Sequence, residues 1–329
     1  MDHPTPLVES RSTQSEPVIA ELGAGVHSID TLMGGFEGIT SSYFIASDRP
    51  ALIETGAALS APNVVASLGA LGCGPTDLAT IVVTHIHLDH AGGVGDLAKA
   101  FPNARIVVHE RGARHLADPT KLVASAYRVF GPKMDEMFGP LLPTEHDRID
   151  ALGERGNIDL GGGRSLETFH NPGHASHHVA LIDSQTGDLY TGDAAGVYVP
   201  ETGDLRPATP PPDFDFDLAL NSLDAMEAVS PSRLLFSHFG PTTDIDRVFS
   251  ESRLQLHHWV EWVRKAHHEG MDFDHALLMV LAKDREVNSK FFDNPEVSEK
   301  FEHLSSSEAQ VSGIWHWLQK TDQSNSSIR

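Results

Sequence analysis

The chain of 329 residues has a single cysteine, Cys73, and so has no partner for a disulfide bond within itself. Cys73 lies in the small-residue segment 71–74 (LGCG), away from every motif that carries charged or histidine side chains. An isolated cysteine in such a segment usually behaves as a small buried hydrophobe. We therefore expect Cys73 to belong to the core and to play no part in chemistry.

The chain also lacks any long run of apolar residues. No stretch approaches the roughly 20 consecutive apolar residues that a membrane-spanning helix needs. The first 17 residues are polar and contain no apolar segment of the kind found in secretion signals. The sequence therefore predicts a cytoplasmic protein that has no association with a membrane.

Basic residues are scarce relative to acidic ones. The chain has 24 Lys and Arg against 46 Asp and Glu, which gives a formal net charge of −22 at pH 7. A field of that sign repels phosphate backbones unless basic residues gather on one face. The short basic group Arg105, Arg111 and Arg114 hardly forms such a patch. Charge therefore argues against a nucleic acid as partner and favours a small-molecule substrate.

Histidine, in contrast, is abundant, and several of the 20 histidines fall into short motifs with aspartate and glycine. The motifs are THIHLDHAGG at 84–93, PGH at 172–174, TGD at 191–193 and FSHFG at 236–240. They follow β-rich apolar runs such as 81–83 (IVV), 189–190 (LY) and 234–236 (LLF). Their polar side chains are therefore expected in loops at strand ends, where buried strands commonly hold a metal site in place.

The spacing within these motifs has a chemical logic. His85 and His87 place two imidazoles close together in one turn, as two nitrogen ligands of one ion require. Asp89 and His90 follow at once with an oxygen and a nitrogen for a neighbouring ion, and the carboxylate of Asp193 can bridge the two. A pair of ions of this kind lowers the pKa of a shared water towards neutrality. The spacing by itself predicts a metal site.

The ordered set of HxHxDH, PGH, GD and a last histidine resembles the metallo-β-lactamase superfamily over roughly residues 17–245. The resemblance implies an α/β fold, a four-layer αββα sandwich with two metals at one edge. It also implies the ligands, which are His85, His87 and His174 at site one, Asp89, His90 and His238 at site two, and Asp193 between them. We further expect Asp89 and Asp193 to take part in catalysis.

The same resemblance implies a metal-dependent hydrolase, in which a metal-bridging hydroxide attacks an ester, thioester or lactone. Two divalent ions are expected, with zinc favoured and iron or manganese as alternatives, because nitrogen and oxygen ligands accept all three. The best-known zinc β-lactamases carry Cys in place of Asp193, and flavodiiron proteins carry Glu in place of His87. Among the named subfamilies, both differences leave members similar to glyoxalase II and to quorum-quenching lactonases as the nearest. The motif HIHLDHAGG and the segment 38–43 (GITSSY) resemble generic metal-dependent hydrolases of the superfamily more than either.

Two alternatives stay open within the superfamily. A mononuclear iron persulfide dioxygenase resembles the same scaffold and needs only His85, His174 and Asp193 as ligands. An RNA-processing nuclease would need a local basic patch to overcome the negative charge of the chain. Metal content distinguishes the first alternative from a dinuclear hydrolase.

Residues around the ligand motifs also carry expectations. The superfamily usually has Asp-x-Gly after its second pair of strands, whereas this chain has Glu54 there. Glu54 is either a carboxylate that tunes nearby ligands or a strand-end residue with no role at the site. His178 follows the PGH turn closely and is expected to support a ligand through a hydrogen bond. Tyr198 is a candidate donor to a substrate oxyanion, although simple packing is favoured.

The catalytic region, 17–245, is preceded by a predicted disordered lead at 1–16 and opens with strand pairs at 19–30 and 41–53. A helical insertion is predicted at about 111–151, broken at Pro119 and at Gly131-Pro132. Its candidates for an apolar wall of the substrate pocket are Tyr127, Phe130, Met134, Met137 and Phe138. A stripe of this kind is more often ordinary core, and both interpretations stay open.

After His238 the pattern becomes helical. Apolar stripes with helical spacing predict a helical region at 246–319, followed by a disordered tail at 320–329. Trp259, Trp315 and Trp317 lie in or beside these stripes. Large aromatic side chains either complete a core or anchor an interface, so the appendage is predicted to contribute to a homodimer, with packing inside one chain as the alternative.

Overall fold

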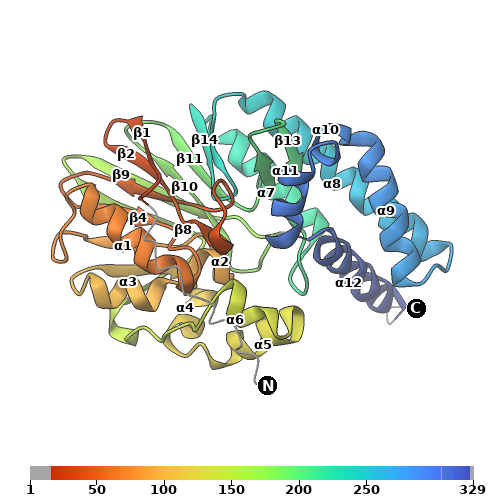
Figure 1. Ribbon diagram of the computed structural model, residues 1–329, viewed down its shortest axis with the longest axis horizontal. Helices are drawn as coiled ribbons and strands as arrows, with labels where there is room; N and C mark the ends of the chain where they lie inside the picture. Colours follow the sequence, from red (N-terminus) through yellow and green to blue (C-terminus); the bar gives the residue numbers. More distant parts are fainter. Residues whose placement is uncertain (1–15, 305, 327–329) are drawn as a thin grey trace, which may run out of the picture.

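The computed structural model describes residues 16–304 and 306–326 (Figure 1). All but the last residue of the predicted lead lies outside this range, as do 327–329 of the predicted tail. The tail prediction is wrong for 320–326, because the last helix continues to Ser326. Within the described residues, no helix is long and apolar enough to cross a membrane.

The first sheet contains seven strands that lie in sequence order. They are β1 (Ile19–Gly23), β2 (Val26–Asp30), β3 (Ser41–Ile45), β4 (Ala51–Ile53), β5 (Thr80–Val82), β6 (Arg105–His109) and β7 (Ile149–Leu152). The first four pair as antiparallel neighbours, which confirms the two predicted strand pairs. The strands β4 to β7 are parallel, so the loops that follow them emerge at one edge of the sheet.

The second sheet contains six strands in the order β15-β14-β11-β10-β9-β8. They are β8 (Arg155–Gly161), β9 (Arg164–His170), β10 (Val179–Asp183), β11 (Asp188–Gly192), β14 (Arg233–Phe236) and β15 (Gly240–Thr242). A separate hairpin consists of β12 (Val197–Val199) and β13 (Asp204–Arg206). Because β11 and β14 are parallel, the loops after both strands leave the sheet at the same edge.

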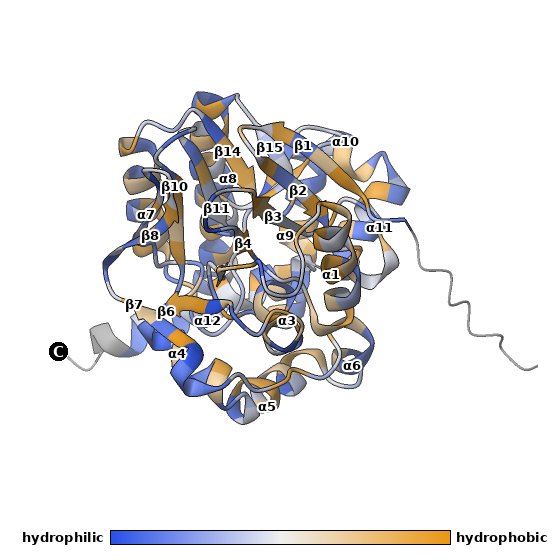
Figure 2. Cartoon of the chain, turned by 90° about the vertical axis from the view of Figure 1, so that its left-hand side faces the viewer, coloured by the Kyte–Doolittle hydropathy of each residue, from blue (hydrophilic) through white to orange (hydrophobic). Residues whose placement is uncertain are grey.

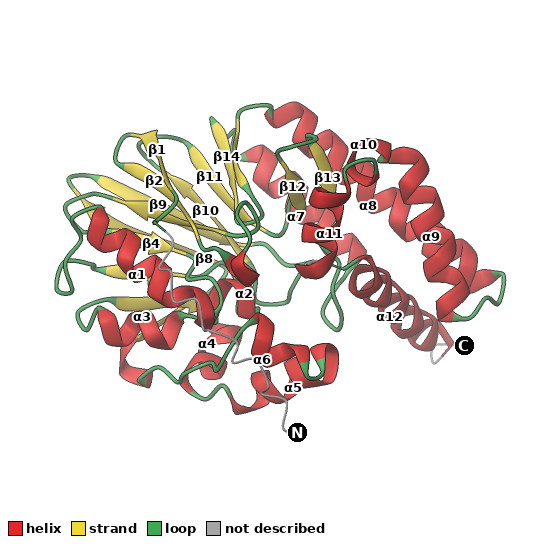
Figure 3. Cartoon of the chain, viewed as in Figure 1, coloured by secondary structure: helices red, strands yellow, loops and turns green. Residues whose placement is uncertain are grey.

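The two sheets pack face to face between layers of helices, so the predicted αββα sandwich is confirmed (Figure 3). On the first sheet, α1 (Ala61–Ala70) and α3 (Val94–Ala100) bury residues such as Val64 and Leu97 against Leu52 and Ile81. On the second sheet, α7 (Phe216–Ala228) and α8 (Ile245–His268) do the same. Figure 2 shows the resulting pattern, with apolar colour on the strands and hydrophilic colour on outer helices such as α4.

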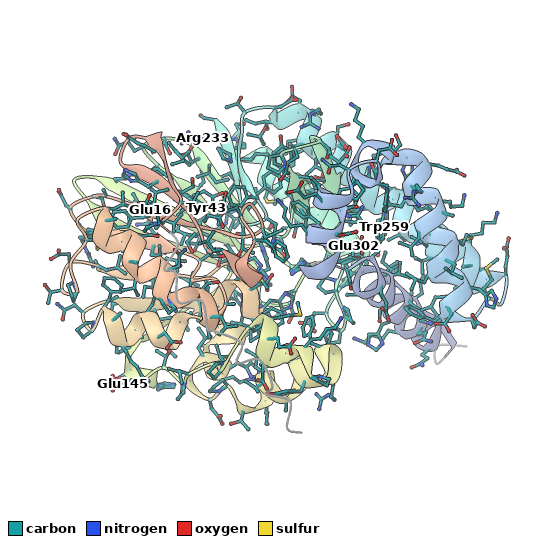
Figure 4. The ribbon with its side chains drawn as sticks, in the orientation of Figure 1. Glu16, Tyr43, Glu145, Arg233, Trp259 and Glu302 are labelled. Atoms are coloured by element: carbon teal, nitrogen blue, oxygen red, sulfur yellow. The ribbon has the colours of Figure 1, made fainter. Side chains whose placement is uncertain are left out.

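Tyr43 joins the two sheets near the edge that carries the histidine motifs (Figure 4). Its ring lies 5.4 Å from that of Tyr190 in an edge-on arrangement, and its hydroxyl donates to the carbonyl oxygen of Phe236 at 2.5 Å. Phe236 is the last residue of β14, two residues before His238. Cross-sheet packing therefore fixes the start of the loop that carries this histidine.

The segment between β6 and β7 is helical, as predicted. It contains α4 (Glu110–Ala117), α5 (Thr120–Phe130) and α6 (Lys133–Met137), with breaks at Pro119 and Gly131-Pro132. The predicted range of 111–151 runs too far at its end, because residues 149–151 belong to β7. Since β6 and β7 are parallel neighbours, the helices form the crossover between two strands of the sheet.

The C-terminal region consists of α9 (Phe273–Val287), α10 (Ser289–Phe292), α11 (Pro295–Leu304) and α12 (Ser307–Ser326), which pack beside α8 (Figure 1). Trp259 is 1% exposed inside the core of the second sheet, and Trp315 and Trp317 pack against that core. These tryptophans therefore have packing partners within one chain. The homodimer stays a prediction.

Cys73 is buried among residues of the first sheet and α1, as predicted. Burial raises the pKa of its thiol to about 11, with the negative charge of Asp77 adding to the effect. A thiol with such a pKa is almost fully protonated at neutral pH and is a poor nucleophile. Its role is packing.

Candidate metal centre

Loops at the ends of four strands bring the predicted ligands to one edge of the sandwich. His85 and His87 follow β5, and the short helix α2 (Leu88–Ala91) then carries Asp89 and His90. His174 follows β9, Asp193 follows β11 and His238 follows β14. All seven side chains that the motifs single out therefore lie in one cluster.

Two glycines allow these loops to pack so closely. A Cβ at Gly92 would lie 2.2 Å from the carbonyl oxygen of Leu88, so only glycine fits directly after the ligand helix. Gly173 has a φ of +129°, and a Cβ there would lie 2.3 Å from the backbone nitrogen of Ala219. The glycines of the motifs are thus required by the backbone beside the ligands.

Three imidazoles converge in the first group. The Nε2 atom of His85 lies 3.0 Å from Nδ1 of His87 and 3.2 Å from Nε2 of His174. The remaining pair, Nε2 of His174 and Nδ1 of His87, is separated by 3.0 Å. Nitrogens bound tetrahedrally to one zinc ion at 2.0–2.1 Å would lie about 3.3 Å apart. The three nitrogen atoms thus have nearly the separations that one shared ion requires.

The second group combines nitrogen and oxygen atoms. Oδ2 of Asp89 lies 3.4 Å from Nε2 of His90 and 3.2 Å from Nε2 of His238. Asp193 faces both groups, because its Oδ1 lies 3.3 Å from His90 Nε2 while its Oδ2 lies 3.5 Å from His174 Nε2 and 3.6 Å from His238 Nε2. One carboxylate therefore spans the two groups.

Two buried atoms at the centre have no hydrogen-bond partner among the described residues, Nε2 of His90 and Oδ1 of Asp193. A buried polar atom without a partner is costly, because it loses its hydration and gains nothing in return. A metal ion would satisfy both atoms. The donor set, the separations and these two atoms together fit a pair of divalent ions.

Backbone carbonyl groups orient the ligand rings. The Nδ1–H of His174 donates to the carbonyl oxygen of Ala208 at 3.0 Å, and that of His238 donates to Ile39 at 2.9 Å. A carbonyl oxygen can only accept, so the proton of each neutral ring lies on Nδ1 and the lone pair of Nε2 faces the centre. The contacts therefore select the tautomer that binds a metal.

Glu54 has a role at the site, which decides between the two interpretations of its position. Its side chain is 2% exposed and accepts hydrogen bonds from the hydroxyls of Thr84, at 2.5 Å, and Ser237, at 3.0 Å. Thr84 in turn contacts Nδ1 of His85 at 2.9 Å, and Glu54 itself lies 3.4 Å from Nδ1 of His90. One carboxylate thus supports a ligand from each group.

His178 also supports the centre, as predicted. The backbone N–H of Asp193 donates to its Nε2 at 3.1 Å, which fixes the start of the loop that follows β11. Tyr198 has a packing role instead, because its ring stacks on Phe236 with 5.6 Å between centroids. The ring of His170 stacks on that of His109, with 4.2 Å between centroids.

The two groups differ in charge. Burial lowers the pKa of His85 well below its usual value and that of His87 to about 3, and neighbouring imidazoles add to both shifts. Burial also acts to lower the pKa of His90 and His238, but the carboxylate of Asp193 and its acidic neighbours outweigh it and raise both. The first group is therefore a set of neutral nitrogen ligands, and the carboxylates of Asp89 and Asp193 supply the negative charge that attracts a cation.

A cleft of about 950 Å³ opens over the centre, and five of the ligands line it. One wall comes from α4, α5 and α6, and the opposite wall comes from residues 210–213, α11, Ser306 and α12 (Figure 1). Of the predicted wall residues, Phe130, Met137 and Phe138 line the cleft. Met134 is buried in the core instead, and Tyr127 is 41% exposed.

The wall formed by α4, α5 and α6 also carries basic residues that were not predicted from the sequence to lie at the site. The cleft is lined along α4, α5 and α6 by Arg111, Arg114, Lys121, Arg128 and Lys133. Of these residues, only Arg111 and Arg114 belong to the short basic group noted in the sequence. They lie in α4, whereas Lys121 lies in α5. The grouping of these basic residues could therefore not be predicted from the sequence, because it depends on the turn at Pro119 that places both helices on one wall of the cleft.

Comparison with known proteins agrees with this geometry. The family model of the metallo-beta-lactamase superfamily matches residues 35–238. A metallo-beta-lactamase fold-containing protein of Sulfurisphaera tokodaii is 29% identical over 220 residues, which cover 66% of this chain and 78% of that one. An N-acyl homoserine lactonase of Bacillus thuringiensis is 26% identical over 246 residues, covering 73% and 83%.

Solved structures show the same architecture. An archaeal metallo-beta-lactamase superfamily protein from Sulfolobus tokodaii superposes with a TM-score of 0.61 at 27% identity, over 71% of this chain and 86% of that chain. The superfamily binds divalent metals, and its members include hydrolases named as lactonases and hydroxyacylglutathione hydrolases. The matched region contains the residues from Glu54 to His238 that form the centre. The chain belongs to the metallo-β-lactamase superfamily.

Proposed function

We propose that the protein is a hydrolase that uses two divalent metal ions to cleave an ester, a thioester or a lactone. The observation that carries the proposal is the convergence of seven nitrogen- and carboxylate-bearing side chains at a cleft large enough for a small substrate. The superfamily includes lactonases and hydroxyacylglutathione hydrolases, which supports a carbonyl substrate of this kind.

With two divalent ions held by these seven side chains, the site would supply a hydroxide near neutral pH and would polarise the carbonyl oxygen. The oxygen of water adds to the carbonyl carbon, the bond from this carbon to the leaving oxygen or sulfur breaks, and the leaving group takes up a proton. Asp89 and Asp193 hold carboxylate oxygens at the floor of the cleft, and we assign the transfer of that proton to them.

The second ligand group favours a dinuclear centre over the mononuclear alternative. A persulfide dioxygenase with one iron would use only His85, His174 and Asp193. Here Asp89, His90 and His238 also converge, and Nε2 of His90 has no hydrogen-bond partner among the described residues. We propose zinc for both positions, with iron or manganese as alternatives that the same ligands accept.

Hydrolysis by metal-loaded protein tests the proposal. The panel contains 4-nitrophenyl acetate, an acyl thioester of N-acetylcysteamine, an N-acyl homoserine lactone and bis(4-nitrophenyl) phosphate. We expect turnover of at least one carbonyl substrate, loss of that turnover after dialysis against a chelator, and recovery with added zinc, iron or manganese. Turnover of the phosphodiester alone, or carbonyl hydrolysis that persists in metal-free protein, would contradict the proposal.

A further inference from the structure

The basic wall of the cleft is unusual for a chain with a net charge of −22. Arginines elsewhere, such as Arg105, Arg164 and Arg233, form ion pairs with aspartates. The five basic residues along α4, α5 and α6 are Arg111, Arg114, Lys121, Arg128 and Lys133. Among the described residues, no carboxylate lies within ion-pair distance of any of them. Their positive charge therefore has no acidic partner within the part of the chain that the structure describes.

Three of these residues, Arg111, Arg114 and Lys121, form what we call the basic cluster. Nε of Arg114 donates to Nε2 of His115 at 3.1 Å, and the charges of Arg114 and Lys121 help burial to lower the pKa of this histidine. Nη1 of Arg111 donates to the carbonyl oxygen of Ser176 at 3.2 Å. Ser176 is two residues from the ligand His174, so the basic cluster adjoins the metal centre.

Of the acidic residues near the basic cluster, Asp118 and Asp213 accept hydrogen bonds from neighbouring groups. Asp118 accepts hydrogen bonds from the backbone and hydroxyl of Thr120. Asp213 accepts from the hydroxyl of Ser176 at 2.6 Å, and Glu110 lines the cleft beside Arg111. On the opposite wall Glu302 pairs with Arg206, and Glu308 is a further acid (Figure 4). An anion would therefore be attracted to the α4 and α5 side of the cleft.

Apolar side chains continue the same wall. Phe130 and Phe138 meet edge to face at 4.9 Å, and Met137 and Leu122 line the cleft beside them. Val129 also faces the cleft, although its side chain is 48% exposed. A ligand that uses the whole wall needs an apolar part and an anionic group.

We propose that the substrate is an ester or thioester that carries a carboxylate or phosphate group, which binds the basic cluster while its apolar part packs against α5 and α6. This inference rests on the proposed hydrolase function and names the substrate class for it. A polyanion such as RNA fits less well, because the cleft has a volume of about 950 Å³ and the chain as a whole is strongly negative.

Three 4-nitrophenyl esters with one leaving group test the inference on metal-loaded protein. They are the neutral pentanoate, the glutarate monoester with a free carboxylate, and the 4-phosphonobutanoate. We expect kcat/KM for at least one anionic ester to exceed that of the neutral ester by about tenfold in low salt, and the ratio to fall as salt is added. The two anionic esters distinguish carboxylate from phosphate as the preferred group.

The variant Arg111→Gln/Arg114→Gln/Lys121→Gln removes the basic cluster. We expect it to reduce the ratio of anionic to neutral kcat/KM to near one. The matched control Lys99→Gln/Arg155→Gln/Lys290→Gln removes the same charge from exposed positions outside the cleft and should keep the ratio. Metal content and circular dichroism are measured for both variants to check that they are folded. A ratio that stays near tenfold without the basic cluster, or that is already one in the unmodified protein, overturns the inference and leaves the hydrolase proposal standing.

If none of the ester, thioester and lactone substrates is cleaved, the hydrolase proposal fails and binding decides the inference. The probes are 8-anilinonaphthalene-1-sulfonate and its neutral counterpart 1-anilinonaphthalene, titrated by fluorescence. When the basic cluster is removed, we expect 8-anilinonaphthalene-1-sulfonate to bind about tenfold more weakly, whereas the affinity for 1-anilinonaphthalene should stay the same. In the control variant, neither affinity should change. Equal affinity in all three proteins overturns the inference. Binding of a labelled RNA oligonucleotide that depends on the basic cluster would do the same, because it would assign the surface to a polymer.

Discussion

Replacing Asp193 by Ala should remove both metal ions and lower hydrolysis on the order of a thousandfold. The reason is its position, with Oδ1 3.3 Å from His90 Nε2 and Oδ2 3.5 Å from His174 Nε2, so that one side chain serves both ligand groups. Metal content is measured by elemental analysis after dialysis, and turnover by the substrate that the panel identifies. Asp159→Ala, at an exposed position on β8, is the control and should keep both ions.

Single-site variants make this prediction sharper. His87→Ala should release the ion of the first group, and His238→Ala that of the second, while Asp193→Ala releases both. Circular dichroism and the unfolding midpoint distinguish loss of ligands from loss of fold. Retention of both ions by Asp193→Ala would show that the carboxylate is not a ligand.

Arg206→Met should lower the free energy of unfolding by about 3–5 kcal/mol, because it leaves a buried carboxylate unpaired. Arg206 ends β13 and is 5% exposed, and its guanidinium pairs with Asp284 at 2.9 Å and Glu302 at 3.0 Å. The same group lies 4.3 Å from the ring centroid of Phe291. One arginine thus connects the β12–β13 hairpin to α9, α10 and α11.

Urea unfolding of metal-free protein measures this effect. Arg253→Met is the control, since its partners Asp224 and Glu227 have exposed side chains and surface pairs contribute about 0–1 kcal/mol. Equal destabilisation by the two variants would show that the buried pair is no more important than a surface one. A second transition in Arg206→Met alone would instead show that the C-terminal helices unfold separately.

The seven side chains that converge could be predicted from the sequence because each of them stands in a short motif after an apolar strand. Support for the ligands was harder to predict. The carbonyl groups of Ala208 and Ile39 orient two imidazoles, and a backbone acceptor has no signature in sequence. Glu54 receives hydrogen bonds from Thr84 and Ser237, which are 30 and 183 residues away in sequence. Only the fold brings these partners together.

The end of the chain shows how a polar segment can still be helical. Residues 320–326 have few apolar side chains and were predicted to be disordered, yet α12 continues through them. Nζ of Lys320 donates to the carbonyl oxygen of Pro212 at 3.0 Å, and Oδ2 of Asp322 lies 3.7 Å from Nδ1 of His267. These contacts with distant segments extend the helix beyond its apolar stripe.

The central claim is a centre for two metal ions, and elemental analysis tests it most directly. The protein is stripped of metal, reconstituted with excess zinc, manganese or iron in separate samples, and desalted before measurement. We predict two ions per chain with at least one of these metals, and one or none in His87→Ala and His238→Ala. A content that never exceeds one ion per chain in the unmodified protein would contradict the account.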